Sequence, residues 1–324
     1  MLPLYRFVTT TRATKEVMSG RNFLLADSGI YREAGRQTTE RREQWVFPVL
    51  YGLLTTKTKE TYARFFRMVV SFWPNFRPDS ISVDFEAGII GAVKEVFSDC
   101  ELSGCFFHLV RNFKKRLATE HLVERYNSDP VFQMYAKMIT SLAFLPIEHL
   151  TLGIMALERE LPLELQPVFD WFINNYTGRP RFDGTRNPAL FDPVIWSVHL
   201  RTIQKRDRTN NYAEAAHRSL QRAFGCDHPS IWTFIDRLRK CQKIIDADFA
   251  KFSIGEQPSK KRKQYRDADR RILTLVERYA QEMGVQNPLV PIHYDPQYFA
   301  NPGPNFNYVI EFLQGISHNY EMNP

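Results

Sequence analysis

The sequence predicts an α/β fold in which two strand–helix units precede a block of helices. Apolar and polar residues alternate in Ser80–Glu86, which is typical of a half-buried strand. Apolar side chains at helical spacing follow at once in Ala87–Phe97. A second unit, Cys100–Val110, leads into a basic helical stretch at 111–117, and helical spacing then recurs through 128–176. This order favours an α/β core followed by a helical segment.

The composition is that of a folded globular protein. The chain has 324 residues, of which 44% are hydrophobic and 14% aromatic. It contains no run of about 18 apolar residues, so no transmembrane helix is expected, and its beginning lacks the core of a signal peptide. Four cysteines are too few for a disulfide scaffold and indicate a reducing compartment. The net charge of +7 permits a polyanionic partner without identifying one.

The remaining elements follow from local patterns. The first 26 residues show little pattern, and residues 28–45 read as a loop or an exposed helix. Val46–Leu54 is a continuous apolar run of strand length. Thr58 begins a helix with one apolar stripe. The residues of that stripe are Tyr62, Phe65, Phe66, Val69 and Phe72.

The C-terminal third is predicted to be helical at first and irregular at its end. Helices are expected at 209–224, from Ser230 to about Phe252, and at 265–283. The basic run that ends at Lys263 is interpreted as a solvated linker, with a nuclear-localisation signal or a DNA-contacting arm as the alternatives. Gln286–Pro324 is rich in Pro and Asn, which favours an extended surface arm or a poorly ordered tail.

Two acidic residues are candidates for chemistry. Asp84 is expected at the carboxyl end of a strand, the edge at which open α/β sheets hold ligands. The alternative is a solvated or capping Asp. Glu86 is read as a surface acid that complements a helix dipole. Glu214 ends Asn211–Glu214, which resembles a capping box, so a purely structural role is its alternative.

An ordered set of motifs resembles the transposase domain of Mutator-like elements, from about Val46 to about Ile244. The motifs are Asp84–Glu86, Gly104–His108, Leu142–Pro146, Tyr176–Gly178, Arg208–Glu214 and His228–Trp232. The resemblance implies a ribonuclease-H-like core, a mixed sheet flanked by helices, interrupted by an all-helical insertion. It also implies an Asp-Asp-Glu (DDE) triad that holds divalent metal, Mg²⁺ or Mn²⁺.

The resemblance divides the chain into five segments, with N-terminal core strands missing. They are a degenerate N-terminal segment at 1–45, the first part of the core at 46–127, a helical insertion and basic loop at 128–204, the last core helices at 205–255, and a basic helix and tail at 256–324.

The triad is incomplete in the sequence. The resemblance implies that Asp84 and Glu214 are metal ligands. Asp27 stands roughly where the first acid is expected, but no strand alternation follows it, and a deletion of the true Asp is the simpler account. Around Glu214, basic side chains are expected to contact the DNA backbone. They include Arg206, Arg208, Arg218 and Arg222.

Two Cys/His pairs are half-sites for zinc. They are Cys105 with His108, and Cys226 with His228. A tetrahedral site built from both pairs is chemically reasonable, but packing is the preferred interpretation and zinc is not expected. Trp196 and Trp232 are assigned to the core, with base stacking as the alternative.

The sequence therefore predicts a DDE-type DNA transposase domain, truncated or degenerate, that acts on double-stranded DNA at element ends and targets. The resemblance implies that metal-held water cuts the DNA and that the freed 3′-hydroxyl attacks the target. A homo-oligomer is compatible with the sequence, and a membrane partner is not expected. The expected location is the nucleus, or the cytoplasm if the chain is an inactive relic of a transposase. One alternative is a catalytically inactive, transposase-derived DNA-binding or regulatory protein. The other is a structural protein without a nucleic-acid partner.

Overall fold

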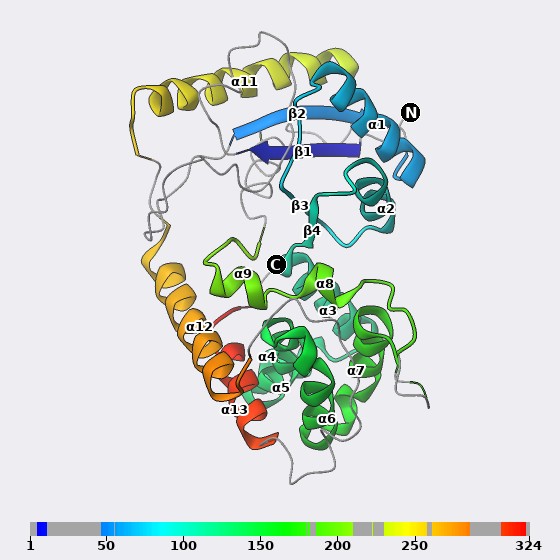
Figure 1. Cartoon of the computed structure of the whole chain (residues 1–324), viewed down its shortest axis with the longest axis vertical. Helices are drawn as coiled ribbons and strands as arrows, with labels where there is room; N and C mark the ends of the chain where they lie inside the picture. The colour runs from blue at the N-terminus through cyan, green and yellow to red at the C-terminus, as the bar shows by residue number, and fades with distance from the viewer. Residues whose placement is uncertain are drawn as a thin grey trace. The chain divides into compact units, whose positions relative to one another are not determined.

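The computed structural model contains two compact units, each made of two stretches of sequence (Figure 1). The first comprises Met1–Ser103 and Asn210–Lys261, and the second comprises Gly104–Thr209 and Arg262–Pro324. The five segments expected from the sequence stay a prediction. The structure describes residues 5–11, 47–54, 56–179, 181, 186–209, 222, 230–257, 261–285 and 306–321.

The first unit contains an antiparallel pair of strands. β1, Tyr5–Thr11, pairs with β2, Phe47–Leu54, and the register places Tyr5 opposite Leu54. β2 confirms the strand predicted at Val46–Leu54. β1 was not predicted, because the residues around it show no clear alternation.

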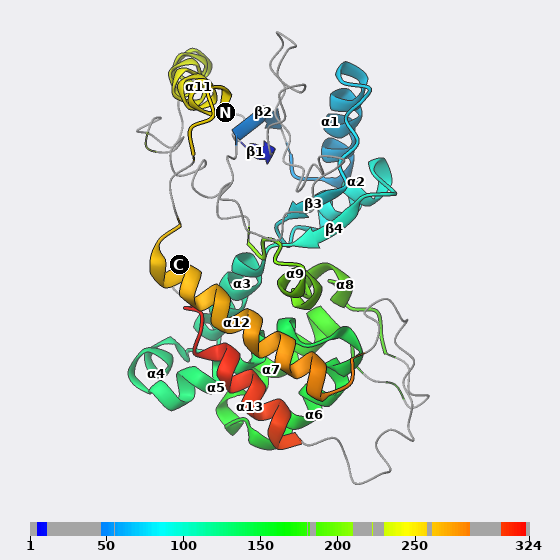
Figure 2. The same ribbon diagram turned by 60° about the vertical axis from the view of Figure 1, so that its left-hand side comes forward.

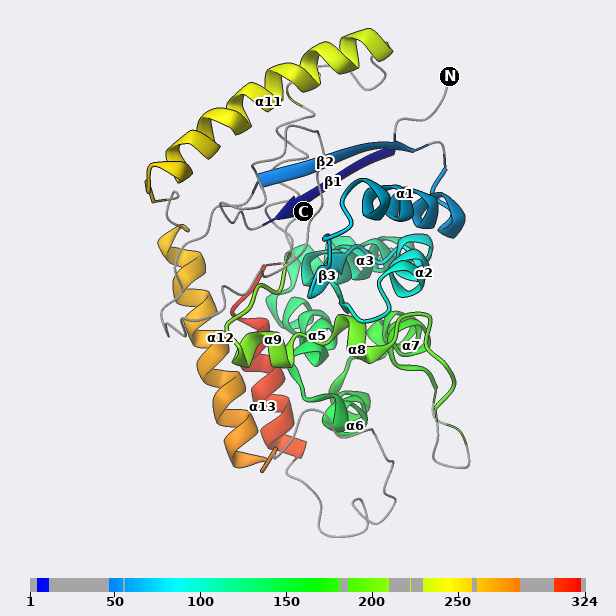
Figure 3. The ribbon, with the colours of Figure 1, turned by 45° about the horizontal axis from the view of Figure 1, so that its top comes forward.

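Helix α1, Lys59–Phe72, begins where the sequence predicts. The Thr58 hydroxyl caps it by accepting a hydrogen bond from the Thr61 N–H at 3.3 Å. The first four residues of the predicted apolar stripe are buried, but Phe72 is 74% exposed. This part of the prediction is wrong because Phe72 is the last helical residue, and none of the elements that the structure describes covers it. α1 lies alongside α2, Ala87–Val96 (Figure 3).

A strand–helix–strand unit follows. β3, Ser80–Val83, leads through α2 to β4, Glu101–Gly104, as the alternation predicts. The two strands form a two-stranded parallel sheet, and the Glu101 N–H donates to the Asp79 carbonyl at 2.9 Å. Because the strands are parallel, both end at the same edge of this sheet.

The helical spacing places Ala87, Ile90, Val93 and Phe97 on one apolar face of the predicted helix, and in α2 the structure buries part of that face. Ile90 and Val93 are buried as expected, whereas Ala87 is exposed because it is the first residue of the helix. The first unit also contains α11, Ile231–Ser253, which confirms the helix predicted from Ser230. The helix predicted at 209–224 lies outside the described residues, apart from Arg222.

The second unit is mostly helical where it is described, and the helices predicted in 128–176 are confirmed. Its helices before residue 209 are α3 (Phe106–Thr119), α4 (Val123–Ser128), α5 (Pro130–Ser141), α6 (Leu150–Glu160), α7 (Gln166–Phe172), α8 (Pro193–Trp196) and α9 (His199–Ile203). The short helical turns between them are η1 (Leu142–Phe144), η2 (Ile147–His149), η3 (Leu163–Leu165) and η4 (Ile173–Thr177).

Aromatic rings fill the core of this unit. Trp196 is 1% exposed, and its indole N–H donates to the Tyr176 carbonyl at 2.6 Å. The Phe172 ring stacks on the Tyr176 ring with 4.9 Å between centroids. Trp196 is therefore a core residue, as preferred from the sequence. Trp232 of α11 is 77% exposed, so its assignment to the core is wrong: it lies in the first turn of its helix, where the side chain remains open to solvent.

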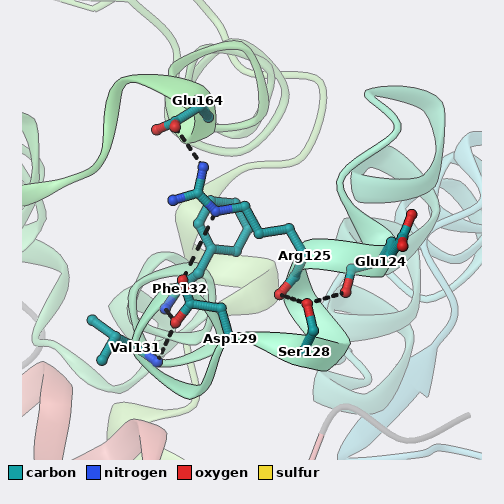
Figure 4. A network of polar contacts seen from close by, with 7 residues as sticks. All are labelled: Glu124, Arg125, Ser128, Asp129, Val131, Phe132 and Glu164. Carbon is teal, nitrogen blue, oxygen red and sulfur yellow. Dashed lines mark hydrogen bonds and ion pairs between the residues drawn. The ribbon is translucent and has the colours of Figure 1, made fainter.

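A polar network joins α4, α5 and η3 at the surface (Figure 4). The Arg125 guanidinium donates to the Glu164 carboxylate and lies 4.6 Å from the centroid of the Phe132 ring. Asp129 accepts a hydrogen bond from the Val131 N–H at 2.9 Å and so caps α5. These charged groups are largely exposed, so we expect the ion pairs to orient the helices more than to stabilise them.

The C-terminal segment corrects a prediction. α12, Lys263–Glu282, lies alongside α13, Phe306–Ser317 (Figure 2). The Tyr279 ring of α12 lies 4.4 Å from the Phe312 ring of α13. The prediction of an extended arm or tail is therefore wrong at 306–317. Buried apolar residues recur there at helical spacing, namely Val309, Phe312, Leu313 and Ile316.

The predicted fold class is confirmed at the level of α/β, with helices predominating. Within the described residues, β1–β2 and β3–β4 are two separate sheets, so the mixed sheet of a ribonuclease-H-like core is not confirmed. None of the described helices has the length and apolarity needed to span a membrane.

Candidate functional site

Asp84 lies at the carboxyl end of β3, as the alternation predicts. β3 ends at Val83, and the Asp84 carbonyl accepts a hydrogen bond from the Glu86 N–H at 2.8 Å, which forms the turn into α2. The Asp84 side chain is exposed. An exposed carboxylate at a strand end is a suitable hard oxygen ligand for Mg²⁺ or Mn²⁺.

Glu86 supports this turn. One carboxylate oxygen accepts a hydrogen bond from the Tyr62 hydroxyl at 2.7 Å, and the other accepts from the Lys57 ammonium at 3.0 Å. Both donors come from α1 or the residues before it, so Glu86 fastens α1 to the start of α2. The prediction that Glu86 serves as a surface acid misses this bracing role.

Gly88 brings the start of α2 close to the preceding loop. A Cβ at this position would overlap the Lys57 carbonyl oxygen. The absence of a side chain therefore permits the close approach that brings Glu86 to Lys57. The glycine in the second position of the helix was a signal for such an approach, and the sequence reasoning did not use it.

The turn after β4 carries the Cys105–His108 pair, and this pair is buried. Cys105 precedes α3, and its carbonyl accepts hydrogen bonds from the N–H groups of His108 at 3.0 Å and Leu109 at 3.1 Å. Cys105 is 0% exposed and His108 is 8% exposed. The burial supports the packing interpretation for this pair. Cys226 and His228 lie outside the described residues, so the joint zinc site stays untested.

Two arginines hold the start of α3. Arg201 is buried, and its guanidinium donates to the Gly104 carbonyl at 2.9 Å. The Arg208 carbonyl accepts a hydrogen bond from the Phe106 N–H at 2.9 Å, while its guanidinium forms an ion pair with Asp269 of α12. The Arg208 and Asp269 side chains are 14% and 10% exposed.

The role of Arg208 in DNA binding stays a prediction. The ion pair with Asp269 does not favour it, because that pair engages the Arg208 guanidinium. Arg206 is half-buried and donates to the Gln204 side chain at 3.0 Å, and Arg222 is exposed. Arg218 lies outside the described residues.

An aromatic cluster covers the same turn, and sequence reasoning missed it. The Phe106 ring lies 5.0 Å from the Phe144 ring and 5.2 Å from the Tyr320 ring. The Tyr320 hydroxyl donates to the Lys137 carbonyl at 2.6 Å. The Arg208 guanidinium lies 5.5 Å from the Phe144 centroid. Tyr320, which follows α13 in sequence, thus helps to fix the start of α3.

The predicted acidic triad is only partly within the described residues. Asp84 is described, whereas Asp27 and Glu214 are not, so their convergence stays a prediction. Among the residues that the structure describes, no group of three or more His, Cys, Asp and Glu side chains is placed to hold a metal ion.

Comparison with protein families supports the resemblance seen in the sequence. Residues 37–112 match the family model described as the MULE transposase domain, where MULE stands for Mutator-like element. The match covers β2 through the first half of α3 and includes Asp84, Cys105 and His108. The chain therefore contains a segment of a MULE transposase domain. No curated protein and no solved structure matches the chain.

Proposed function

We propose that the chain is a DDE-type DNA transposase domain, which cleaves and transfers DNA strands with the help of a divalent metal. The observation that carries this proposal is the match at residues 37–112 to the MULE transposase domain, in which Asp84 occupies the exposed end of β3. Double-stranded DNA is the proposed partner, and the nucleus is the proposed location.

The proposed roles of the acids follow from their chemistry. Mg²⁺ or Mn²⁺ bound by the chain would activate the nucleophile and stabilise the leaving oxygen. Asp84 supplies one hard oxygen ligand. Glu214 is the proposed second ligand, and Asp27 is the candidate for the third. A ribonuclease-H-like arrangement of the core would bring these carboxylates together.

The test is metal-dependent cleavage of duplex DNA by the full chain. We expect Asp84→Asn to lower the cleavage rate by at least about a hundredfold, because the amide is a poor metal ligand. Asp99→Asn is the matched control, since Asp99 is also exposed and lies near the other end of α2. Its cleavage rate should equal that of the wild type.

Two results would contradict parts of the proposal. Cleavage that survives Asp84→Asn would eliminate Asp84 as a metal ligand. Tight DNA binding by the wild type, without cleavage in either metal, would instead identify an inactive transposase-derived DNA-binding protein.

A further inference from the structure

Helix α12 begins with an exposed row of cations. Lys263, Arg266 and Arg270 stand at positions i, i+3 and i+7, which places them on one face of the helix. All three are exposed, and the Arg270 side chain is 76% exposed. Between 261 and 271 the sequence has six Lys and Arg residues but two acidic ones.

The acidic residues of this segment do not balance the cations. The Asp269 carboxylate forms an ion pair with Arg208, and Asp267 forms an ion pair with Arg270 at 3.3 Å, so both acids of the segment are already engaged. No acidic residue lies in the first turn of α12. Positive charge at this end of a helix opposes the helix dipole, so an anionic partner would stabilise the segment.

Helix α11 provides a comparison for this row. Two of its cations each pair with an acid one turn away. Lys240 forms an ion pair with Asp236 at 2.9 Å, and Lys251 forms one with Asp248 at 2.7 Å. On the face of Lys263, Arg266 and Arg270, the described residues 263–270 of α12 supply one acid, Asp267, for three cations, so this face keeps an excess of positive charge.

We propose that Lys263, Arg266 and Arg270 form a binding surface for the phosphate backbone of duplex DNA. The row is straight and extends over roughly 10 Å at 1.5 Å per residue. A duplex presents about one charge per 1.7 Å of its axis, so each side chain can meet a phosphate. The inference rests on the proposed function in taking DNA as the partner.

The experiment measures binding of the full chain to a mixed-sequence duplex of about 30 base pairs. Fluorescence anisotropy is recorded over a salt series in EDTA, so that cleavage plays no part. The variant replaces Lys263, Arg266 and Arg270 by Gln. We expect its affinity to fall at least about tenfold and the slope of log K against log salt to decrease by about 2.7.

The control variant removes the same charge from three cations that each form an ion pair with an acid, as Arg270 of the α12 row does with Asp267. It combines Lys240→Gln, Lys251→Gln and Arg67→Gln, since Arg67 forms an ion pair with Glu95. We expect its slope to remain close to that of the wild type. Circular dichroism should show that both variants fold, because the replaced side chains are largely exposed.

The outcomes separate this inference from the proposed function. If the wild type does not bind the duplex, both fail. If the wild type binds and the α12 variant binds equally well, or if both variants lose the same affinity, only the inference is overturned. An α12 variant that binds DNA normally but no longer accumulates in nuclei would assign the row to nuclear import and would also overturn the inference.

Discussion

Two strand–helix turns with similar local sequence patterns have different surroundings. After β3, the Asp84 side chain is exposed, and the turn is braced by Glu86 against α1. After β4, Cys105 and His108 are buried. The Arg201 guanidinium donates a hydrogen bond to the Gly104 carbonyl, and the Phe106 N–H donates one to the Arg208 carbonyl. These two bonds hold the second turn.

The difference shows that the strand–helix pattern alone does not determine the role of its polar residues. The family model covers both turns, yet only the first presents a carboxylate to solvent. We therefore expect substitutions in the first turn to affect chemistry, and substitutions around the second to affect stability. The predictions below test this contrast.

The largest expected effect on stability comes from the ion pair beside the second turn. Arg208→Ala would leave the mostly buried Asp269 carboxylate without its guanidinium. We expect the free energy of unfolding, measured by urea denaturation, to fall by about 3–4 kcal/mol. Arg270→Ala is the control, because Arg270 is highly exposed, and it should change this free energy by less than about 0.5 kcal/mol.

A double variant sharpens the test. Replacing Arg208 by Met together with Asp269 by Leu removes both charges and keeps apolar volume. We expect it to recover most of the lost stability, because no unpaired charge remains. A double variant as unstable as Arg208→Ala would show that the ion pair is not what holds this region.

Acid should loosen the surroundings of the second turn. Burial lowers the pKa of His149 to about 4, and the nearby His199 adds to the shift. Burial also lowers the pKa of His199, whose ring N–H donates to the Phe144 carbonyl at 2.9 Å. In the unfolded chain His149 takes up a proton as the pH falls below about 6.5, whereas in the folded chain it does so only near pH 4. Stability is therefore lost as the pH falls from 6.5 to 4, by about 3 kcal/mol for His149.

Urea denaturation between pH 7.5 and 5 measures this loss. His149→Phe should flatten the pH dependence, even though it removes the hydrogen bond to Tyr279. His121→Asn is the control: His121 is exposed, and its φ of 58° is one that Asn tolerates. If both variants keep the full pH dependence, the acid sensitivity does not come from His149.

Much of the fold could be predicted because its elements follow local periodicity. β3, α2 and α12 each show the spacing of their own secondary structure over their whole length. α13 shows the limit of this reasoning. Its apolar residues have helical spacing, but the surrounding Pro and Asn residues favoured a tail. Burial at element ends, as for Phe72, depends on neighbours that periodicity does not reveal.

The candidate site was predictable only where a residue's role depends on its own strand. Asp84 could be placed because it ends an alternating run. The roles of the two arginines could not, because their partners are distant in sequence. Arg201 contacts Gly104, 97 residues away, and Arg208 contacts Asp269, 61 residues away. Pairings of this kind arise from tertiary structure.

The first turn depends on the close approach of Gly88 to the Lys57 carbonyl group. Disturbing this approach is expected to have the smallest of the effects on stability. A methyl group in Gly88→Ala would overlap the Lys57 carbonyl oxygen, and a backbone atom cannot move aside cheaply. We expect the free energy of unfolding to fall by about 2 kcal/mol, although Ala favours a helix over Gly by about 1 kcal/mol. If Asp84 acts as proposed, the cleavage rate should also fall, because the start of α2 shifts beside it.

Gly91→Ala is the matched control in the same helix. Its Cβ would meet the side chain of Lys59, 3.1 Å away, which can rotate aside. We expect stability to stay the same or rise by up to about 1 kcal/mol, with no change in cleavage. Equal destabilisation by both substitutions would show that α2 tolerates no added methyl group anywhere. In that case the close approach at Gly88 would not explain the shape of the turn that presents Asp84.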